Sequence, residues 1–531
     1  MWTKIIIILC LYCQTVLANI TYDLYHEPQD EKLHIELEFT GDKTGKTTIS
    51  IPKNIWGHDV GKQIKNYKIL SSDCHVKESK NILLHKPSQK IKISYDIINV
   101  SQKDGSSYYS YSNKDGFYFL HHFALIYPKS QKEIQATVRY HSQVAKEIHT
   151  SFGKIPVEHS LVVSLDKLLG GFSICGSKDA LIIDDNVLAF KVAKNKLSEI
   201  KHVLTNIISS QKDFCGSEVK DNLFVFINSH RESDSFYGTL LDHNVMLMFL
   251  PKNFTPESVL FKNTLAHENF HKWIGREVIK FNSKNEISSK WFFEGFTDYF
   301  SYKINLLNKI ITFDKYLAIY NEVVKRYFTS PYKLVINKEI SKKNYWELGK
   351  IAYYRGHIIA QELDSEVQKL SKGKYNLQSV LRSMIKMFQE NKELEFSDSL
   401  LANVLQKVTG QNFKDKLTSM INGDINLSNN LLDKAVLSYE KVQSINYGFD
   451  FLKSTKHHKI INLDKKSNAY KAGLRNGDKF IKIHRSIYHD NIPNSKIIIY
   501  KTNGKNIKFV PNILYLKIPQ FRSFLPDCSK N

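Results

Sequence analysis

The sequence predicts a multidomain α+β protein with an N-terminal β domain, a second domain that is mixed and then mainly helical, and a small C-terminal domain. Three observations predict this class: alternating apolar and polar residues in the first 140 or so positions, helical apolar spacing after residue 300, and a new strand and turn pattern after about residue 430. With 42% hydrophobic residues over 531 positions, the chain has enough apolar material for more than one core.

The first 18 residues have the composition of a secretory signal peptide. One lysine precedes a short apolar core, and Val16 and Ala18 occupy the small-residue positions before a cleavage site. The apolar core is too short to span a membrane, and no later segment reaches the roughly 18 consecutive apolar residues that a span requires. We therefore expect a mature chain that begins at Asn19, has no transmembrane segment and is periplasmic or extracellular.

Residues 19–158 are predicted to form a β-sandwich-like domain. LHIELEF, TTISIP, IKISYDII and ATVRYHS alternate in hydrophobicity, and GDKTG and KDGSS are turn signals between them. Residues 159–432 form the second predicted domain, which begins with short strands and becomes helical. Its NVMLMFL segment, residues 244–250, is predicted to be an edge strand that binds an extended peptide by adding it to the sheet.

The sequence TLAHENFHKW contains the spacing of a zinc site. His267 and His271 are four residues apart, so on a helix both imidazoles face one metal ion. Glu268 lies beside the first histidine, where it can act on a metal-bound water as general base. We expect the helix to begin with Thr255 as N-cap and Pro256 in its first turn.

A carboxylate from a neighbouring segment completes the predicted site. Glu294 lies in the aromatic run WFFEGFTDYF and supplies a third protein ligand, which leaves a coordination position open for water. Asp298 follows four residues later on the same helical face. Because a ligating imidazole commonly donates its second N–H to a carboxylate, we expect Asp298 to accept this hydrogen bond, although a solvated helix residue is the alternative. The expected cofactor is one Zn²⁺ per chain.

These motifs resemble the gluzincin metallopeptidases of the thermolysin clan, and most closely the glycyl aminopeptidase family. That family carries HExxH, a third zinc ligand in an E-G-F-T-x-Y run and a PDZ domain behind the catalytic domain. The alanyl aminopeptidase family has a shorter interval than the 22 residues that separate His271 from Glu294 here. The resemblance implies a thermolysin-like fold for residues 159–432, and peptides or proteins as substrates.

The resemblance also implies roles for two further segments. Tyr353, three residues before Gly356, matches the tyrosine that stabilises the tetrahedral oxyanion, with Tyr354 as a competitor and simple packing as the alternative. In YGTLLDHN, Gly238 and Asp242 match the run that grips the substrate's free amino group. Asp242 stands where the family has glutamate, and its side chain is one methylene shorter, which leaves aminopeptidase or endopeptidase specificity open.

The C-terminal segment 440–515 resembles a PDZ domain, with a tail at 516–531. SNAYKAGLRNGDKFIKI has the expected short helix, a turn at Asn476 and Gly477, and a strand. A loop and strand are predicted to receive a peptide carboxylate or β-strand as a possible ligand; they comprise Tyr447, Gly448, Phe449, Asp450 and Phe451.

Cysteine and charge patterns add little chemistry. The mature chain carries Cys74, Cys175, Cys215 and Cys528 as free thiols or disulfides; Cys175 and Cys215 are one pairing among those that the sequence leaves open.

The net charge of +22 comes from lysines spread along the chain, without an arginine-rich cluster or nucleic-acid motif. We therefore expect no nucleic-acid partner.

The sequence thus predicts a secreted zinc metallopeptidase that removes N-terminal residues, with zinc-activated water and Glu268 as general base. Three alternatives stay open. One is a zinc endopeptidase, and another is a PDZ peptide-binding protein whose zinc site is not catalytic. The third, suggested only by the net charge, is a nucleic-acid or surface binder.

Overall fold

The computed structural model describes most of the chain. The described residues are 20–55, 58–77, 81–100, 108–129, 134–176, 180–184, 187–217, 219, 223–231, 236–282, 285–340, 345–486 and 492–523. The predicted signal peptide and Cys528 lie outside them. The chain divides into two compact units, Met1–Thr205 with Lys220–Glu268, and Asn206–Val219 with Asn269–Asn531. In the part of the chain that the structure describes, no helix has the length and apolarity needed to cross a membrane.

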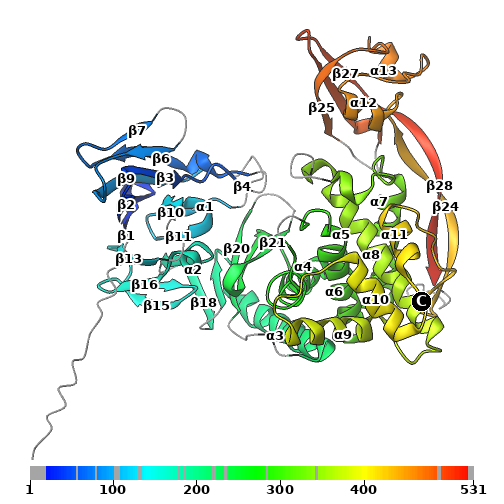
Figure 1. The fold of residues 1–531 in the computed structure, drawn as a ribbon, viewed down its shortest axis with the longest axis horizontal. Coiled ribbons are helices and arrows are strands. Elements are labelled where there is room, and N and C mark those ends of the chain that lie inside the picture. The colour runs from blue at the N-terminus through cyan, green and yellow to red at the C-terminus, as the bar shows by residue number, and fades with distance from the viewer. Residues whose placement is uncertain are drawn as a thin grey trace, which may run out of the picture. The chain divides into compact units, whose positions relative to one another are not determined.

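The described residues of the first unit begin with sheets of six, five and four strands and a two-stranded sheet of β4 (Asn54–Ile55) and β5 (His58–Asp59), which confirms the predicted N-terminal β domain (Figure 1). Strands β1 (Ile20–Glu27) and β2 (Lys32–Thr40) pair in antiparallel orientation and bury every second residue, as their alternating sequences predict. Their buried side chains share a large core with β9 (Lys90–Ile98) and β13 (Gln135–His141). The bounds of the other strands in these sheets are β3 Lys46–Ser50, β6 Ile64–Ile69, β7 His75–Lys77, β8 Ile82–Leu84, β10 Tyr111–Asn113, β11 Gly116–Leu120, β12 Tyr127–Pro128, β14 Glu147–Thr150 and β15 Gly153–Pro156.

The β region continues beyond residue 158. Strand β16 (Ser160–Ser164) pairs with β13, and β17 (Phe172–Gly176) pairs with β11 and β14. Residues 160–176 were expected in the second domain, because a strand pattern such as that of β16 does not reveal its pairing partner. A short helix, α2 (Leu165–Leu169), connects them, with the Ser164 side chain as N-cap.

A second sheet of the same unit has the strand order β18-β19-β20-β22-β21. Its strands are β18 (Ala180–Asp184), β19 (Val187–Phe190), β20 (Phe224–Arg231), β21 (Tyr237–Leu241) and β22 (Val245–Pro251). Strand β22 is buried along its whole length and lies between β20 and β21. The prediction that residues 244–250 form an edge strand is therefore wrong: β21 is the edge strand next to it. An aromatic core that includes Tyr118, Phe226 and Phe249 packs this sheet against the preceding one.

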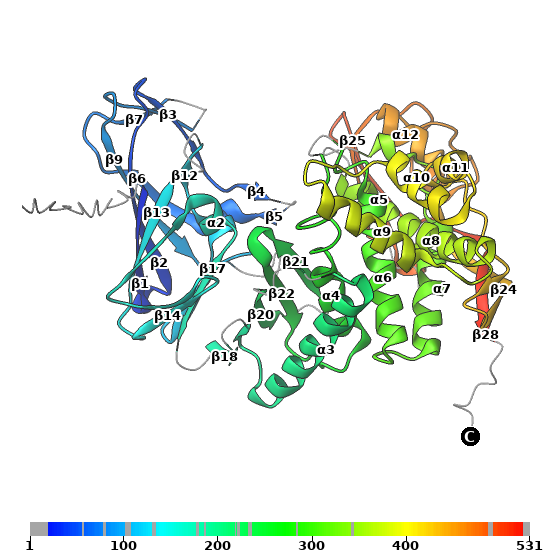
Figure 2. The ribbon, with the colours of Figure 1, turned by 60° about the horizontal axis from the view of Figure 1, so that its bottom comes forward.

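Helices dominate the described residues between 290 and 421, as the apolar spacing predicts (Figure 2). In α9 the buried residues recur at helical spacing, and Asn376 and Ser379 form a capping box at its start. The α-helices between residues 197 and 421 of the described chain are α3 (Leu197–Cys215), α4 (Val259–Phe270), α5 (Lys290–Phe293), α6 (Gly295–Leu307), α7 (Phe313–Thr329), α8 (Tyr345–Leu370), α9 (Leu377–Glu390), α10 (Asp398–Thr409) and α11 (Lys414–Ile421). Helices α3 and α4 each continue from one unit into the other.

The C-terminal part of the second unit is framed by two long strands. Strand β24 (Ala435–Asn446) pairs with β28 (Asn512–Ser523) over their full lengths, so residues 516–523 belong to a strand and not to the predicted tail. Phe521 exchanges two hydrogen bonds with Asn321 of α7, at 2.7 and 2.8 Å. The paired strands therefore lie along α7, as Figures 1 and 2 both show.

Between β24 and β28, the segment with the PDZ-like sequence forms α12 (Phe451–His457), α13 (Asn468–Lys471), β25 (Phe480–Ser486), β26 (Lys496–Lys501) and β27 (Asn506–Phe509). The predicted short helix, glycine turn and strand are α13, the segment with Gly477 at φ 88°, and β25. However, the segment after the loop 447–450 is helix α12 and not the predicted strand, because the Asp450 side chain accepts a hydrogen bond from the Lys453 N–H and caps a helix.

Candidate metal centre

Helix α4 positions the first part of the site. It contains His267 and Glu268, and His271 follows one residue after its end, still one turn from His267. The three side chains are buried, with 5 to 9% of each residue exposed. The helix begins later than predicted: Ser258, and not Thr255, accepts the capping hydrogen bond, from the Phe261 N–H. Thr255 instead accepts a backbone hydrogen bond from Ser258 in the preceding turn.

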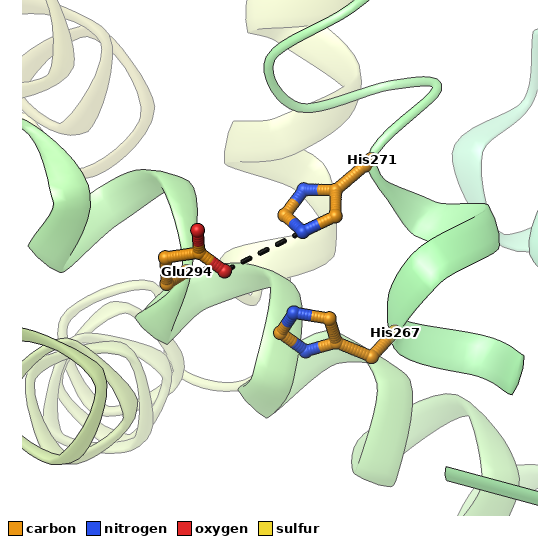
Figure 3. A group of neighbouring side chains, drawn as sticks. All are labelled: His267, His271 and Glu294. Atoms are coloured by element: carbon orange, nitrogen blue, oxygen red, sulfur yellow. Dashed lines mark ion pairs between the residues drawn. The ribbon is translucent and has the colours of Figure 1, made fainter. Parts of the chain in front are cut away.

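Glu294 lies at the junction between α5 and α6, and its carboxylate faces the two histidines (Figure 3). One potential ligand atom from each of His267, His271 and Glu294 lies within 4.8 Å of the others. Glu294 Oε2 is 3.4 Å from His271 Nε2. Tetrahedral zinc with bonds of about 2.0–2.1 Å separates its ligand atoms by roughly 3.4 Å, so this pair fits two ligands of one ion.

The second polar atom of His271 and that of Glu294 each have a protein partner. His271 Nδ1 lies 3.2 Å from the Ile274 carbonyl, so the Nδ1–H tautomer donates there and leaves Nε2 for a metal. Lys290 donates a hydrogen bond of 2.9 Å to Glu294 Oε1. The Phe293 ring stacks on the His271 ring at 4.4 Å, and the Lys290 ammonium lies 4.0 Å from the same Phe293 ring.

Sequence reasoning did not single out Lys290. The available signal was its spacing, since Lys290 precedes Glu294 by four residues, and opposite charges at that spacing face each other on a helix. Such pairs are common on helix surfaces, and only the burial of both side chains distinguishes this one: 14% and 7% of the two side chains are exposed.

Asp298 lies in the first turn of α6, where its carboxylate accepts a hydrogen bond from His357 Nδ1 of α8 at 2.9 Å. His357 is almost fully buried and lies among the rings of Tyr299, Tyr302 and Tyr320. This contact ties α6 to α8 close to Glu294. The predicted hydrogen bond from a zinc-binding imidazole to Asp298 stays a prediction.

Gly238 lies directly against the proposed general base. A Cβ atom on Gly238 would be 2.5 Å from Cγ of Glu268 and 2.9 Å from its Oε1. The absence of a side chain is what allows β21 to approach Glu268. Since β21 is an edge strand, its outer backbone groups are in position to pair with an extended peptide beside Glu268.

Asp242 follows β21 directly, as the first residue of a short 3₁₀ turn, Asp242–Asn244. Its side chain lies outside the described part of the structure. Its predicted contact with a substrate amino group therefore stays a prediction.

Tyr353 and Tyr354 both lie on α8 and are both half-buried. The Lys350 ammonium lies 4.5 Å from the Tyr353 ring centroid, whereas Tyr354 interacts with Arg326. Gly356 brings this helix against the segment that carries Glu294, because a Cβ there would lie 1.7 Å from the Trp291 carbonyl oxygen. The role of Tyr353 as oxyanion donor, with Tyr354 as its competitor, stays a prediction.

The loop predicted to bind a peptide in the PDZ-like part is itself packed. Tyr447, Phe449 and Phe451 are at most 9% exposed, and Tyr447 stacks on Phe451 at 4.2 Å. Gly448 has φ 80°, which its lack of a side chain permits. The binding of a peptide carboxylate by this loop stays a prediction.

All three described cysteines of the mature chain, Cys74, Cys175 and Cys215, are free thiols. The pairing of Cys175 with Cys215 is therefore wrong. Burial raises the pKa of Cys175 to about 11 and that of Cys215 well above its usual range, so neither is poised as a thiolate.

Together the fold and the His-His-Glu group define a zinc metallopeptidase, a hydrolase of peptide bonds. Residues 260–366 match the family model of the M61 glycyl aminopeptidases. Among curated proteins, none matches the sequence.

Solved structures resemble the chain at low sequence identity. The aminopeptidase N family protein from Idiomarina loihiensis is 16% identical with a TM-score of 0.67, over 96% of this chain and 98% of that one, which shows the fold. The M1 zinc metallopeptidase from Deinococcus radiodurans is 13% identical with a TM-score of 0.45, over 77% of this chain and 96% of that one. Leukotriene A4 hydrolase from Saccharomyces cerevisiae is 11% identical with a TM-score of 0.45, over 76% of this chain and 66% of that one.

Proposed function

We propose that this protein is a secreted aminopeptidase that holds one Zn²⁺ between His267, His271 and Glu294 and removes N-terminal residues from peptides. The observation that carries the proposal is the position of Glu268, which lies beside the His-His-Glu group and in van der Waals reach of the edge strand β21. The metal donors and a binding edge for an extended peptide thus converge on one carboxylate.

The donor set suits zinc, because two imidazoles and one carboxylate leave a position open for water. When bound, Zn²⁺ supplies a water of lowered pKa, about 7, and polarises the scissile carbonyl. Glu268 takes the proton from the attacking water and delivers it to the leaving amine. Tyr353 donates a hydrogen bond to the developing oxyanion without changing its own protonation state.

Strand β21 orients the substrate. Its outer edge pairs with the peptide main chain, and Gly238 keeps that chain close to Glu268. Asp242, directly after the strand, pairs with the substrate ammonium, which fixes the N-terminal residue at the zinc site. If Asp242 does not make this pair, the same strand accepts blocked peptides, and the protein is an endopeptidase.

Secretion is part of the proposal because residues 1–18 have the features of a signal peptide. Expression of the full chain in a bacterial host tests it. Mass spectrometry of the periplasmic or culture fraction should find a mature chain that begins at Asn19. Full-length protein retained in the cytoplasm would contradict secretion.

The activity is tested with a peptide library in which each sequence has a free and an acetylated N-terminus. We expect zinc-loaded protein to release single N-terminal residues from the free members alone. The Glu268→Gln variant should bind zinc and lose a factor of at least about 10² in kcat. Internal cuts in both members would establish an endopeptidase, and a fully active Glu268→Gln variant would refute the assignment of the base.

A further inference from the structure

The ribbon formed by β24 and β28 has one face toward the helices and one exposed face in its middle section. The first face carries Ser444, Ile518 and Gln520, which are buried, and Gln520 donates a hydrogen bond of 3.0 Å to the Asn321 carbonyl of α7. Side chains of a strand alternate between its two faces, and residues opposite each other in the register share a face. The other face carries Tyr439, Lys441, Gln443, Ile513, Tyr515 and Lys517. All six residues are exposed, and we call them the outer face of the ribbon.

The outer face is basic and aromatic. Lys441 and Lys517 lie directly opposite each other in the register. The Lys441 ammonium lies 4.9 Å from the ring centroid of Tyr515, and the Lys517 ammonium lies 5.3 Å from that of Tyr439. An aromatic ring attracts an ammonium without neutralising it, so both lysines keep their charge. None of the six residues is acidic.

The neighbouring acidic residue does not neutralise these lysines. Glu440 belongs to the opposite face of the ribbon and pairs with Arg522 at 3.6 Å. Within the described part of the chain, neither Lys441 nor Lys517 forms an ion pair. Like charges directly opposite each other in a sheet are destabilising. The lysine pair therefore lowers the stability of the isolated ribbon, and a negatively charged partner would relieve this repulsion.

We propose that the outer face of the ribbon binds the surface of a lipid bilayer that contains anionic lipids. Lysines near such a surface are attracted to the headgroups, and tyrosines favour the boundary between the headgroups and the acyl chains. Tyr439, Tyr515 and Ile513 are 56, 53 and 40% exposed, so their apolar surface is accessible for shallow insertion. The net charge of +22, spread along the chain, adds long-range attraction.

A bilayer explains the outer face better than a soluble polyanion does. A polyanion would pair with the lysines, but it has no apolar layer to cover Ile513. The lysine ammoniums also lie over the rings of Tyr439 and Tyr515, which leaves less ring surface for stacking with a base or a sugar. The proposal concerns the ribbon alone and is independent of the proposed peptidase activity.

The test is co-sedimentation of the chain from Asn19 with lipid vesicles. This start omits the predicted signal peptide, whose apolar core would itself bind lipid. We expect at least about tenfold tighter binding to vesicles of phosphatidylglycerol and phosphatidylcholine in equal parts than to phosphatidylcholine vesicles. High salt should weaken the binding to the anionic vesicles, because it screens the lysine charges. Equal binding to both kinds of vesicle, or to neither, would overturn the proposal.

A pair of lysine variants assigns the binding to the ribbon. Lys441→Gln together with Lys517→Gln should weaken binding to the anionic vesicles about 30-fold, from about fivefold for each lysine. Lys407→Gln together with Lys414→Gln is the matched control, because it removes two charges from exposed positions of α10 and α11. The control should bind almost as tightly as the wild type. An equal loss of affinity in both double variants would overturn the proposal, since the net charge alone would then carry the binding.

A third double variant tests the contribution of the tyrosines. Tyr439→Ser together with Tyr515→Ser keeps both lysines and removes the aromatic surface, so it should also weaken binding to the anionic vesicles. Full affinity of this variant would overturn the assignment to a bilayer, because the partner would then be recognised as a polyanion only. All substituted side chains are exposed, and the Tm of each variant confirms that it is folded.

Discussion

Lys290 Nζ lies 2.9 Å from Oε1 of Glu294, while the second carboxylate oxygen, Oε2, lies 3.4 Å from Nε2 of His271. Each oxygen of Glu294 therefore has a separate role: one is held by the lysine and the other is directed at the metal position. Phe293, between the His271 ring and the Lys290 ammonium, packs both in place. The lysine thereby favours a single metal bond from Glu294, which keeps a position open for water.

Replacement of Lys290 by methionine should weaken zinc binding about tenfold, because partners of a metal ligand typically contribute 10- to 100-fold to metal affinity. The dissociation constant can be measured by competition with a chromophoric chelator. Lys303→Met is the matched control, since the Lys303 side chain is also 14% exposed and pairs with Asp364. Equal zinc affinity of both variants would show that Lys290 does not position Glu294.

Gly238→Ala should lower kcat with little change in zinc affinity. The new methyl group would lie 2.5 Å from Cγ of Glu268, so the base must move. A displacement of about 1 Å in a catalytic group can cost on the order of 100-fold in rate. Thr239→Ala, on the next residue of β21, serves as the control in the same peptide assay. A Gly238→Ala variant with wild-type kcat would mean that Glu268 has room to relax without loss of function.

Tyr353→Phe should reduce kcat by about 10²- to 10³-fold, the usual loss when one oxyanion donor is removed, with a small effect on KM. Tyr354→Phe removes a hydroxyl that interacts with Arg326 and should act mainly on KM. Steady-state kinetics of the two variants distinguish these outcomes. A larger fall in kcat for Tyr354→Phe would transfer the oxyanion role to Tyr354.

The part of the site that depends on local spacing could be predicted from the sequence. His267 and His271 come together because one helical turn separates them, and the aromatic run around Glu294 marks a second buried segment. The position of Gly238 against Glu268 was not predictable, because it depends on the order of the strands in the sheet. Periodicity identified residues 244–250 as a strand, but only the pairing shows that β21 covers its edge.

The other differences between the predicted and the observed elements also arise from contacts that a sequence pattern does not reveal. Residues 516–523 form part of β28 because they pair with β24, far away in sequence, and the helix α12 replaces a predicted strand because of one capping contact of Asp450. Thr255 was predicted to cap the helix, but Ser258 caps it. Serine and threonine are both preferred at the N-cap, so the sequence alone did not distinguish the two positions. Elements with strong hydrophobic periodicity, such as α9, could be predicted without knowledge of their contacts with the rest of the chain.

Glu362 provides a test of the fold that is independent of catalysis. This carboxyl group of α8 is 8% exposed, and one of its oxygens accepts hydrogen bonds from the N–H and the hydroxyl of Ser428, at 2.7 and 2.5 Å. Burial raises its pKa from 4.5 to about 7, against the lowering effect of these hydrogen bonds. The folded state therefore holds a proton on Glu362 at pH values where the unfolded chain has released it.

Because the folded pKa is raised, the stabilising contribution of Glu362 is complete below pH 4.5 and is lost as the pH rises to about 7. The shift corresponds to about 3 kcal/mol. Glu362→Gln stays neutral at every pH, so its Tm should exceed that of the wild type at pH 8 by several degrees and should not exceed it at pH 5. Differential scanning calorimetry at the two pH values measures this, with Glu390→Gln, a change at an exposed residue of α9, as the control. A difference between variant and wild type that is the same at both pH values would show that Glu362 titrates normally in the folded protein.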